Sequence, residues 1–249
     1  MATINKVKQA IQNKTKAYGM VLTWPSPQII ELVGTLGFDY VQIDGEHGAF
    51  DLVDVEEACR TAELVGLTLI ARVPNIESST INQFLDRGVQ GIIGPHISNK
   101  ADAEQLVRAS CFGPMGERSF GGGRGVHFGL RKNDRPGYYA EANRQMLVGA
   151  MLEDRASMDN LDDIMAVPGI DFFYIGMNDF SQGHGYPGGA DAPEVLKARA
   201  EAFERVHAAG KLMREDFIVE TTSIEMIING AKKVTDKRSQ DREAAKGGK

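Results

Sequence analysis

The chain has 249 residues, of which 42% are hydrophobic and 25% are charged, as in an ordinary globular protein. No apolar run approaches the roughly 18–20 residues of a membrane span, and no apolar leader opens the chain. Two cysteines are too few for a disulfide framework. We therefore expect a cytoplasmic protein with no membrane partner. The formal net charge of −6 argues against nucleic acid as the main partner.

The first half of the chain alternates short apolar runs with stretches of helical periodicity, after a first helix over 4–13. This strand–helix alternation is typical of a parallel sheet covered by helices. The expected strands are 17–24, 38–44, 67–73 and 89–95, and the helices that follow them are 27–37, 51–66, 78–88 and 100–110.

The second half of the chain resumes the alternation after an interruption. Two glycine-rich segments, 111–145 and 177–191, are too long for idle connections, and we expect both to lie over a functional site. The run GGGRG in the first of them favours a flexible lid over a phosphate-binding loop, because the P-loop lysine is missing. The expected strands are 146–152, 170–176, 211–214 and 231–236, and the expected helices are 157–169, 193–210 and 221–230.

The strands are almost continuously apolar, which indicates that both of their faces are buried, as in a parallel sheet. About 250 residues with eight strand–helix units predict an α/β fold of the TIM (β/α)8 barrel type, with an atypical last unit. We assign 1–235 to one barrel domain and 236–249 to a charged tail. An open doubly wound sheet is the alternative, but no GxGxxG or GxxxxGK[ST] follows an early strand.

Charged side chains follow several strands at the point where each strand ends. In a barrel these carboxyl ends meet at one mouth, which holds the active site. Unpaired charge that converges there would cost several kcal/mol, so stability alone is a poor explanation for it. The residues concerned are Asp44, Glu46 and His47 after the second strand, Arg72 after the third, Glu153 after the fifth and Asp179 after the sixth.

The strand ends permit more than one interpretation of each residue. Glu153 and Asp179 suit Mg²⁺ or Mn²⁺, which prefer oxygen ligands, or they are a helix cap and a surface acid. Arg72 can bind a carboxylate or a developing enolate with two donors, or it forms an internal ion pair. His47 can be a general base or an ordinary loop histidine, and Asp86 reads as a solvated helix residue. For these last two the residues alone favour the simpler interpretation.

Five segments, in this order and spacing, resemble the HpcH/HpaI aldolase family. The family comprises metal-dependent class II pyruvate aldolases, similar to 4-hydroxy-2-oxoheptanedioate aldolase, and the resemblance runs from about residue 17 to residue 211. The segments are FDYVQIDGEHGAFD, ARVPNIESSTINQFLDRGVQGIIGP, FGPMGERSFG, LEDRASMDNLDDIMAVPGIDFFYIGMNDFSQGHGYP and HAAGK.

The resemblance assigns catalytic roles residue by residue. It implies that His47 in DGEH is the catalytic base and that Asp86 in LDRG is the acid that pairs with it. It also implies that Arg72 binds pyruvate and stabilises its enolate. For His47 and Asp86 the resemblance therefore reverses the interpretation that the residues alone favour.

The resemblance also implies a metal site. Glu153 and Asp179 match the two ligands of a divalent cation, which can be Mg²⁺, Mn²⁺ or Co²⁺, and Asp44 and Glu46 match acids near the water shell of that cation. The match implies that the substrate contacts Gly176 and Asn178 as well as Arg72.

The chain departs from the family pattern at three places. Met151 stands where the family often has a glutamine, the family's Gly-Pro-x-Asp-Leu is replaced by GMNDF at 176–180, and the last strand is charged and short. These departures concern the surroundings of the metal and substrate, and the closure of the barrel.

The expected activity is reversible cleavage of 4-hydroxy-2-oxo acids to pyruvate or hydroxypyruvate and an aldehyde, by a homo-oligomer such as a hexamer or trimer of dimers. An imine mechanism is disfavoured because the only strand lysines, Lys211, Lys232 and Lys233, belong to the last units. Two alternatives stay open: an enzyme that decarboxylates oxaloacetate and uses the enolate, of the macrophomate synthase type, and a non-catalytic anion-binding barrel.

Overall fold

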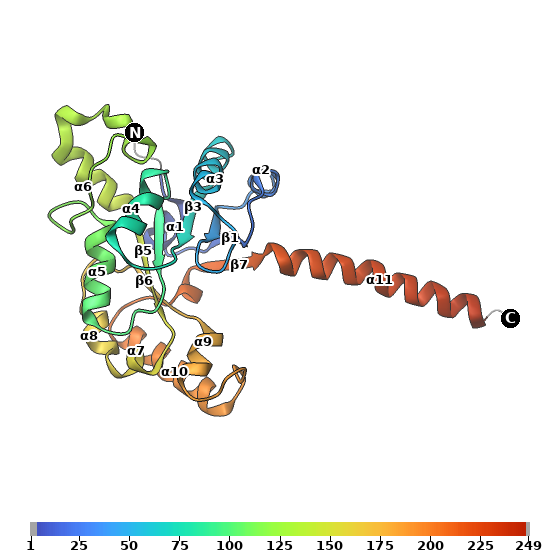
Figure 1. The fold of residues 1–249 in the computed structure, drawn as a ribbon. Coiled ribbons are helices and arrows are strands. Elements are labelled where there is room, and N and C mark those ends of the chain that lie inside the picture. Colours follow the sequence, from blue (N-terminus) through green and yellow to red (C-terminus); the bar gives the residue numbers. More distant parts are fainter. Residues whose placement is uncertain (1–3, 248–249) are drawn as a thin grey trace.

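The computed structural model describes residues 4–247, with side chains up to residue 238. Its seven strands form one parallel sheet in the order β6-β5-β4-β3-β2-β1-β7. The sheet curls on itself and helices cover its outer face (Figure 1), which confirms the expected α/β barrel architecture. The strands are β1 (Ala17–Leu22), β2 (Tyr40–Asp44), β3 (Thr68–Arg72), β4 (Gly91–Gly94), β5 (Leu147–Leu152), β6 (Phe172–Ile175) and β7 (Ile218–Thr222).

The expected helices follow the strands in the predicted order, but further helices, over Arg135–Gln145 and Met177–Gly183, lie in the segments expected to be glycine-rich loops. The one expected over 157–169 is split into two short helices. The helices are α1 (Lys6–Asn13), α2 (Pro27–Thr35), α3 (Leu52–Leu64), α4 (Ser78–Asp86), α5 (Lys100–Ser110), α6 (Arg135–Gln145), α7 (Arg155–Asp159), α8 (Leu161–Met165), α9 (Met177–Gly183), α10 (Pro193–Ala208) and α11 (Ser223–Gly247).

Alternate residues of each strand enter two different parts of the core, as the pleat requires. On β2, Val41 and Ile43 pack with the helices, whereas Tyr40 packs inside the curled sheet with Ile70 and Phe172. Helix α1 closes the amino ends of the strands, since its Val7 joins the inner cluster. The carboxyl ends remain available for a site.

The last barrel unit differs from the sequence-based expectation. Met213 makes only an isolated parallel bridge to Phe173, because its backbone N–H donates to Asp216 and the chain turns there. On the side away from β2, β1 pairs with β7. The sequence analysis missed this strand, although its sequence Ile-Val-Glu-Thr-Thr is rich in β-branched residues. The strand expected at 231–236 is wrong, since these residues belong to α11.

A buried arginine lies where the regular seventh strand would be. Arg214 donates to Gln42 Oε1 over 2.7 Å and forms an ion pair with Glu220. The Tyr40 hydroxyl donates to the same glutamate over 3.0 Å. These bonds connect the turn after Met213 to β2 and β7, so the interior is closed there by side chains instead of backbone pairing.

Helix α11 extends away from the barrel (Figure 1). The boundary expected between barrel and tail, at residue 235, falls within this helix and stays a prediction. No helix in the described part of the chain is both long and apolar enough to cross a membrane. Cys59 and Cys111 are free and buried.

The two glycine-rich segments lie at opposite ends of the barrel. Residues 177–191 begin with α9 at the carboxyl end of β6, whereas 111–145 follow α5 and include α6 at the amino ends of the strands (Figure 1). The expectation that residues 111–145 lie over the mouth of the barrel to which they belong is therefore wrong. A helix after a strand returns the chain to the amino end, so the segment after α5 starts there.

Candidate active site

A cavity of about 440 Å³ opens at the carboxyl ends of the strands. It lies where a barrel is expected to carry its chemistry. Six of the nine site residues that the sequence analysis singled out line it: His47, Arg72, Glu153, Gly176, Asn178 and Asp179.

Asp44 and Arg72 form the most buried ion pair at this mouth. Parallel pairing places them side by side on β2 and β3. Arg72 Nε donates to Asp44 Oδ1 over 2.9 Å, and Nη2 donates to Oδ2 over 2.5 Å. Burial opposes ionisation of Asp44, but the hydrogen bonds and charge of Arg72 hold the pKa of that carboxyl below its ordinary value. Arg72 can thus form the internal ion pair with Asp44 and also bind a substrate.

Glu46 connects Arg72 to a histidine that the sequence analysis left without a role. Its Oε2 lies 3.1 Å from Arg72 Nη1, and its Oε1 lies 3.1 Å from Nε2 of His96. His96 is the second residue after β4, so its place at a strand end was a signal in the sequence. Glu46 is therefore held between a cation and an imidazole.

Glu153 is almost fully buried at the end of β5, with 2% of its surface exposed. Its Oε2 accepts a 2.9 Å hydrogen bond from the backbone N–H of His96. Burial raises the pKa of Glu153, and the hydrogen bond from His96 partly opposes that rise. A carboxylate that is desolvated in this way gains from a nearby cation.

The end of β6 brings three predicted residues next to Glu153. Asp179 is half-buried in the first turn of α9, and Asn178 beside it is exposed. A Cβ atom at Gly176 would lie 2.3 Å from Glu153 Oε1, so only glycine leaves room for this carboxylate. Glu153 and Asp179 therefore line one cavity from adjacent strand ends.

His47 lies at the rim of the cavity. Its backbone N–H donates to Asp44 Oδ1 over 3.2 Å, while its side chain is 63% exposed and has Nε2 3.9 Å from Glu46 Oε2. The imidazole is thus anchored through its backbone and accessible to a substrate.

Asp86 does not lie at this mouth. It ends α4, which returns from the carboxyl end of β3 to the amino end of β4, and it contacts the glycine-rich segment at Gly121. Its Oδ1 is buried without a hydrogen-bond partner among the described residues. Within one chain the structure therefore does not bring Asp86 to His47.

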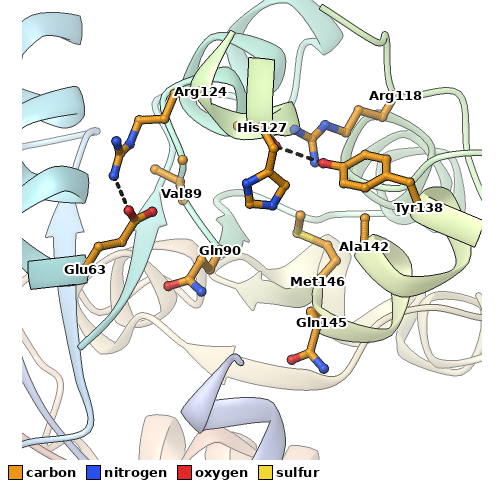
Figure 2. A pocket seen from close by; sticks show the side chains of 12 residues that line it. Glu63, Val89, Gln90, Arg118, Arg124, His127, Tyr138, Ala142, Gln145 and Met146 are labelled. Carbon is orange, nitrogen blue, oxygen red and sulfur yellow. Dashed lines mark hydrogen bonds and ion pairs between the residues drawn. The ribbon is translucent and has the colours of Figure 1, made fainter. Parts of the chain in front are cut away.

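A second, smaller cavity of about 80 Å³ lies at the same end as Asp86 (Figure 2). Arg124 and Glu63 form an ion pair on one side of it, and Arg118 and Tyr138 lie on the other. Arg118 is 8% exposed, and its Nε has no hydrogen-bond partner in the described part of the chain. Buried polar atoms at this end thus remain unsatisfied within one chain.

The mouth has the donor atoms for a cation, with few protein ligands. Among residues 4–238, no group of three or more His, Cys, Asp or Glu side chains is placed to hold a metal ion. The two carboxylates of Glu153 and Asp179 still match Mg²⁺ and Mn²⁺, which bind one or two carboxylates together with water and substrate oxygens. Met151 is buried in the cavity wall and adds no polar ligand.

Known proteins are similar to this chain over almost the whole barrel. The family model described as HpcH/HpaI aldolase/citrate lyase matches residues 18–237. The chain is 34% identical over 222 residues to a 4-hydroxy-2-oxovalerate aldolase from Novosphingobium aromaticivorans, a match that covers 87% of this chain and 83% of the relative. It is 32% identical to a hydroxypyruvate/pyruvate aldolase from Roseovarius nubinhibens, over 84% of this chain and 81% of that protein.

A solved structure extends the comparison to the fold. The crystal structure of an HpcH/HpaI aldolase/citrate lyase family protein from Burkholderia cenocepacia is similar, with a TM-score of 0.85 and 25% sequence identity. The similarity covers 94% of this chain and 99% of the other.

Proposed function

The chain belongs to the HpcH/HpaI aldolase/citrate lyase family, and we infer that it is a class II pyruvate aldolase, a carbon–carbon lyase. It cleaves 4-hydroxy-2-oxo acids reversibly to pyruvate or hydroxypyruvate and an aldehyde, as its relatives' names indicate for them. The observation that carries this conclusion is the family match over 18–237, which includes every strand end of the mouth up to Asp179.

We propose that Glu153 and Asp179 hold a divalent cation, which is Mg²⁺, Mn²⁺ or Co²⁺. The family is typically metal-dependent, and the two carboxylates line the same cavity. When bound, the cation acts as a Lewis acid on the oxygens of the 2-oxo acid. Asp44 and Glu46, at the end of β2, would accept hydrogen bonds from the waters of that cation.

Arg72 supplies positive charge where the enolate oxygen develops. Its guanidinium is fixed by Asp44 and Glu46, so it is oriented before substrate arrives. Gly176 and Asn178 contact the carboxylate of the 2-oxo acid from the other side of the cavity, which they line.

His47 acts as the general base. In cleavage it takes the proton of the C4 hydroxyl, directly or through a water, and the bond between C3 and C4 breaks to release the aldehyde. The electron pair of that bond remains on the enolate of the 2-oxo acid, which becomes pyruvate when C3 takes up a proton. In condensation it returns the proton to the aldehyde oxygen. The exposure of its ring at the rim supports this role, since the ring is accessible to the hydroxyl.

Asp86 orients His47 from a second copy of the chain, because within one chain the two residues lie at opposite ends of the barrel. Asp86 is partly exposed at that end, so a second copy can reach it. The enzyme is then a homo-oligomer, such as a hexamer or trimer of dimers, whose site is complete only between copies.

A donor–acceptor assay tests the function. The protein is incubated with pyruvate or hydroxypyruvate and a panel of aldehydes, with and without EDTA, and then with borohydride. We expect aldol products that EDTA abolishes and Mn²⁺ restores, with no borohydride trapping, since the described cavity lining includes no lysine. Activity that survives EDTA and is trapped by borohydride would overturn the metal mechanism. A parallel incubation contains oxaloacetate and no aldehyde. Consumption of oxaloacetate there would favour the alternative enzyme, which decarboxylates oxaloacetate and uses the enolate.

A further inference from the structure

His96 has an unusual backbone conformation for a histidine. Its φ is +52°, in the left-handed region that only a few per cent of non-glycine residues adopt, histidine, asparagine and aspartate more often than the others. The flanking backbone holds it there, because the N–H of Ile97 donates to the carbonyl of Met151 on β5 over 3.0 Å. Residues that their surroundings hold in sparsely populated backbone conformations cluster at functional sites.

This conformation directs two groups of His96 at the acids of the mouth. Its backbone N–H donates to Glu153 Oε2 over 2.9 Å, and its ring Nδ1 lies 3.5 Å from the same oxygen. Its ring Nε2 lies 3.1 Å from Glu46 Oε1. The imidazole therefore stands between two carboxylates that carry like charges.

The contacts of Glu153 fix which of its oxygens remains available. Oε2 is turned toward His96 on the β4 side, whereas Oε1 is turned toward Gly176 on the β6 side. Asp179, the other proposed cation ligand, follows Gly176 in the first turn of α9. A partial rotation of the Glu153 carboxylate would lose the hydrogen bond from His96 and change the direction of both oxygens.

We propose that His96 is a positioning residue for the cation site. Its ring, with Nε2 3.1 Å from Glu46 Oε1 and Nδ1 3.5 Å from Glu153 Oε2, keeps the two carboxylates apart, so that Glu153 keeps the orientation in which Oε1 faces Gly176. This inference rests on the proposed function, since it assumes that Glu153 binds a divalent cation. Residues that orient metal ligands through hydrogen bonds commonly change metal affinity by about 10–100-fold when they are mutated.

Three variants separate the ring from the backbone. His96→Gly removes the imidazole, keeps the backbone N–H and permits the left-handed conformation, so it is expected to fold. His96→Gln provides an uncharged donor of similar reach toward Glu46. His127→Gly is the matched control, because His127 also has a left-handed backbone, with φ +49°, but lies at the opposite end of the barrel.

Mn²⁺ binding to the metal-free proteins, followed by the electron paramagnetic resonance signal of free Mn²⁺, is the test. We expect His96→Gly to weaken Mn²⁺ affinity about 10-fold or more, His96→Gln to restore most of it, and His127→Gly to bind as the wild type does. Thermal unfolding of the same samples in EDTA separates positioning from folding, since a purely structural role would lower the melting temperature and leave the affinity unchanged.

Two results would overturn the proposal. His96→Gly that binds Mn²⁺ as tightly as wild-type protein would remove the positioning role and leave the proposed function intact. Wild-type protein that binds no Mn²⁺ would remove the cation site itself, and the role of His96 with it.

Discussion

The guanidinium of Arg72 and the carboxylate of Asp44 face each other across adjacent strands and share two hydrogen bonds, of 2.9 and 2.5 Å. Asp44 also accepts from the backbone N–H groups of Glu46 and His47, at 3.1 and 3.2 Å. One aspartate therefore fixes both Arg72, the proposed substrate-binding arginine, and the turn that carries His47, the proposed general base. This relationship makes separate predictions for activity and for stability.

Arg72→Lys should lower kcat/KM by about 10²–10³-fold, because a lysine cannot hold Asp44 with two donors and also place positive charge at the enolate oxygen. Steady-state cleavage of a 4-hydroxy-2-oxo acid, with pyruvate release as the readout, measures the effect. Arg60→Lys is the control, since Arg60 is exposed and pairs only with Glu56 one helical turn away. Equal activity of both variants would exclude a role for the guanidinium geometry.

Asp44→Asn should reduce stability in a pH-dependent way. Arg72 holds the pKa of Asp44 below its ordinary value, despite burial, so the folded state binds fewer protons than the unfolded state near pH 4. The stability that Asp44 contributes is therefore present above an unfolded pKa of about 3.9 and is lost as pH falls through the lower folded pKa. Urea unfolding of both proteins from neutral to acid pH measures the difference in unfolding free energy. A difference that stays constant down to the lowest pH would contradict the assignment.

The mouth could be predicted from the sequence because its signals are local. An apolar run that ends in Asp44-Gly45-Glu46-His47 marks the end of a strand, and parallel neighbours end at the same edge, so Arg72 had to lie near Asp44. The six regular strand–helix units follow from the same periodicity. The family resemblance added the roles of the residues, which no periodicity encodes.

The parts that the sequence did not predict depend on contacts between distant segments. Position 213 pairs with β6 through one bridge, and the interior beyond it is closed by Arg214 and Glu220, which no apolar pattern marks. The left-handed conformation of His96 comes from its neighbours on β5, since histidine itself disfavours it. Asp86 was paired with His47 by resemblance, whereas one chain separates them by the length of the barrel.

Gly176→Ala should weaken the cation site while the fold persists. The new Cβ would lie 2.3 Å from Glu153 Oε1, so the carboxylate has to move away from Gly176. We expect weaker Mn²⁺ binding and slower aldol cleavage. Gly122→Ala is the control, because a Cβ there has no neighbour within 4 Å among the described residues. Unchanged Mn²⁺ affinity in Gly176→Ala would show that Glu153 Oε1 is not the oxygen that binds the cation.

Mixing two inactive variants should restore activity if Asp86 acts on His47 of another copy. His47→Ala and Asp86→Ala are each expected to lose about 10²–10⁴-fold in kcat, as when a general base or its partner is removed. When the two are unfolded and refolded together, a symmetric oligomer combines one intact His47 with one intact Asp86 at about a quarter of its sites.

The control for this mixing experiment is a pair of variants whose substituted residues belong to the same site in the same chain. His47 and Arg72 line the same cavity, so no mixed oligomer of His47→Ala and Arg72→Ala contains an intact site, and that mixture should stay inactive. Activity that returns only when His47→Ala is mixed with Asp86→Ala therefore identifies a site shared between copies. If neither mixture recovers although native gels show mixed oligomers, Asp86 does not act on His47 across the interface.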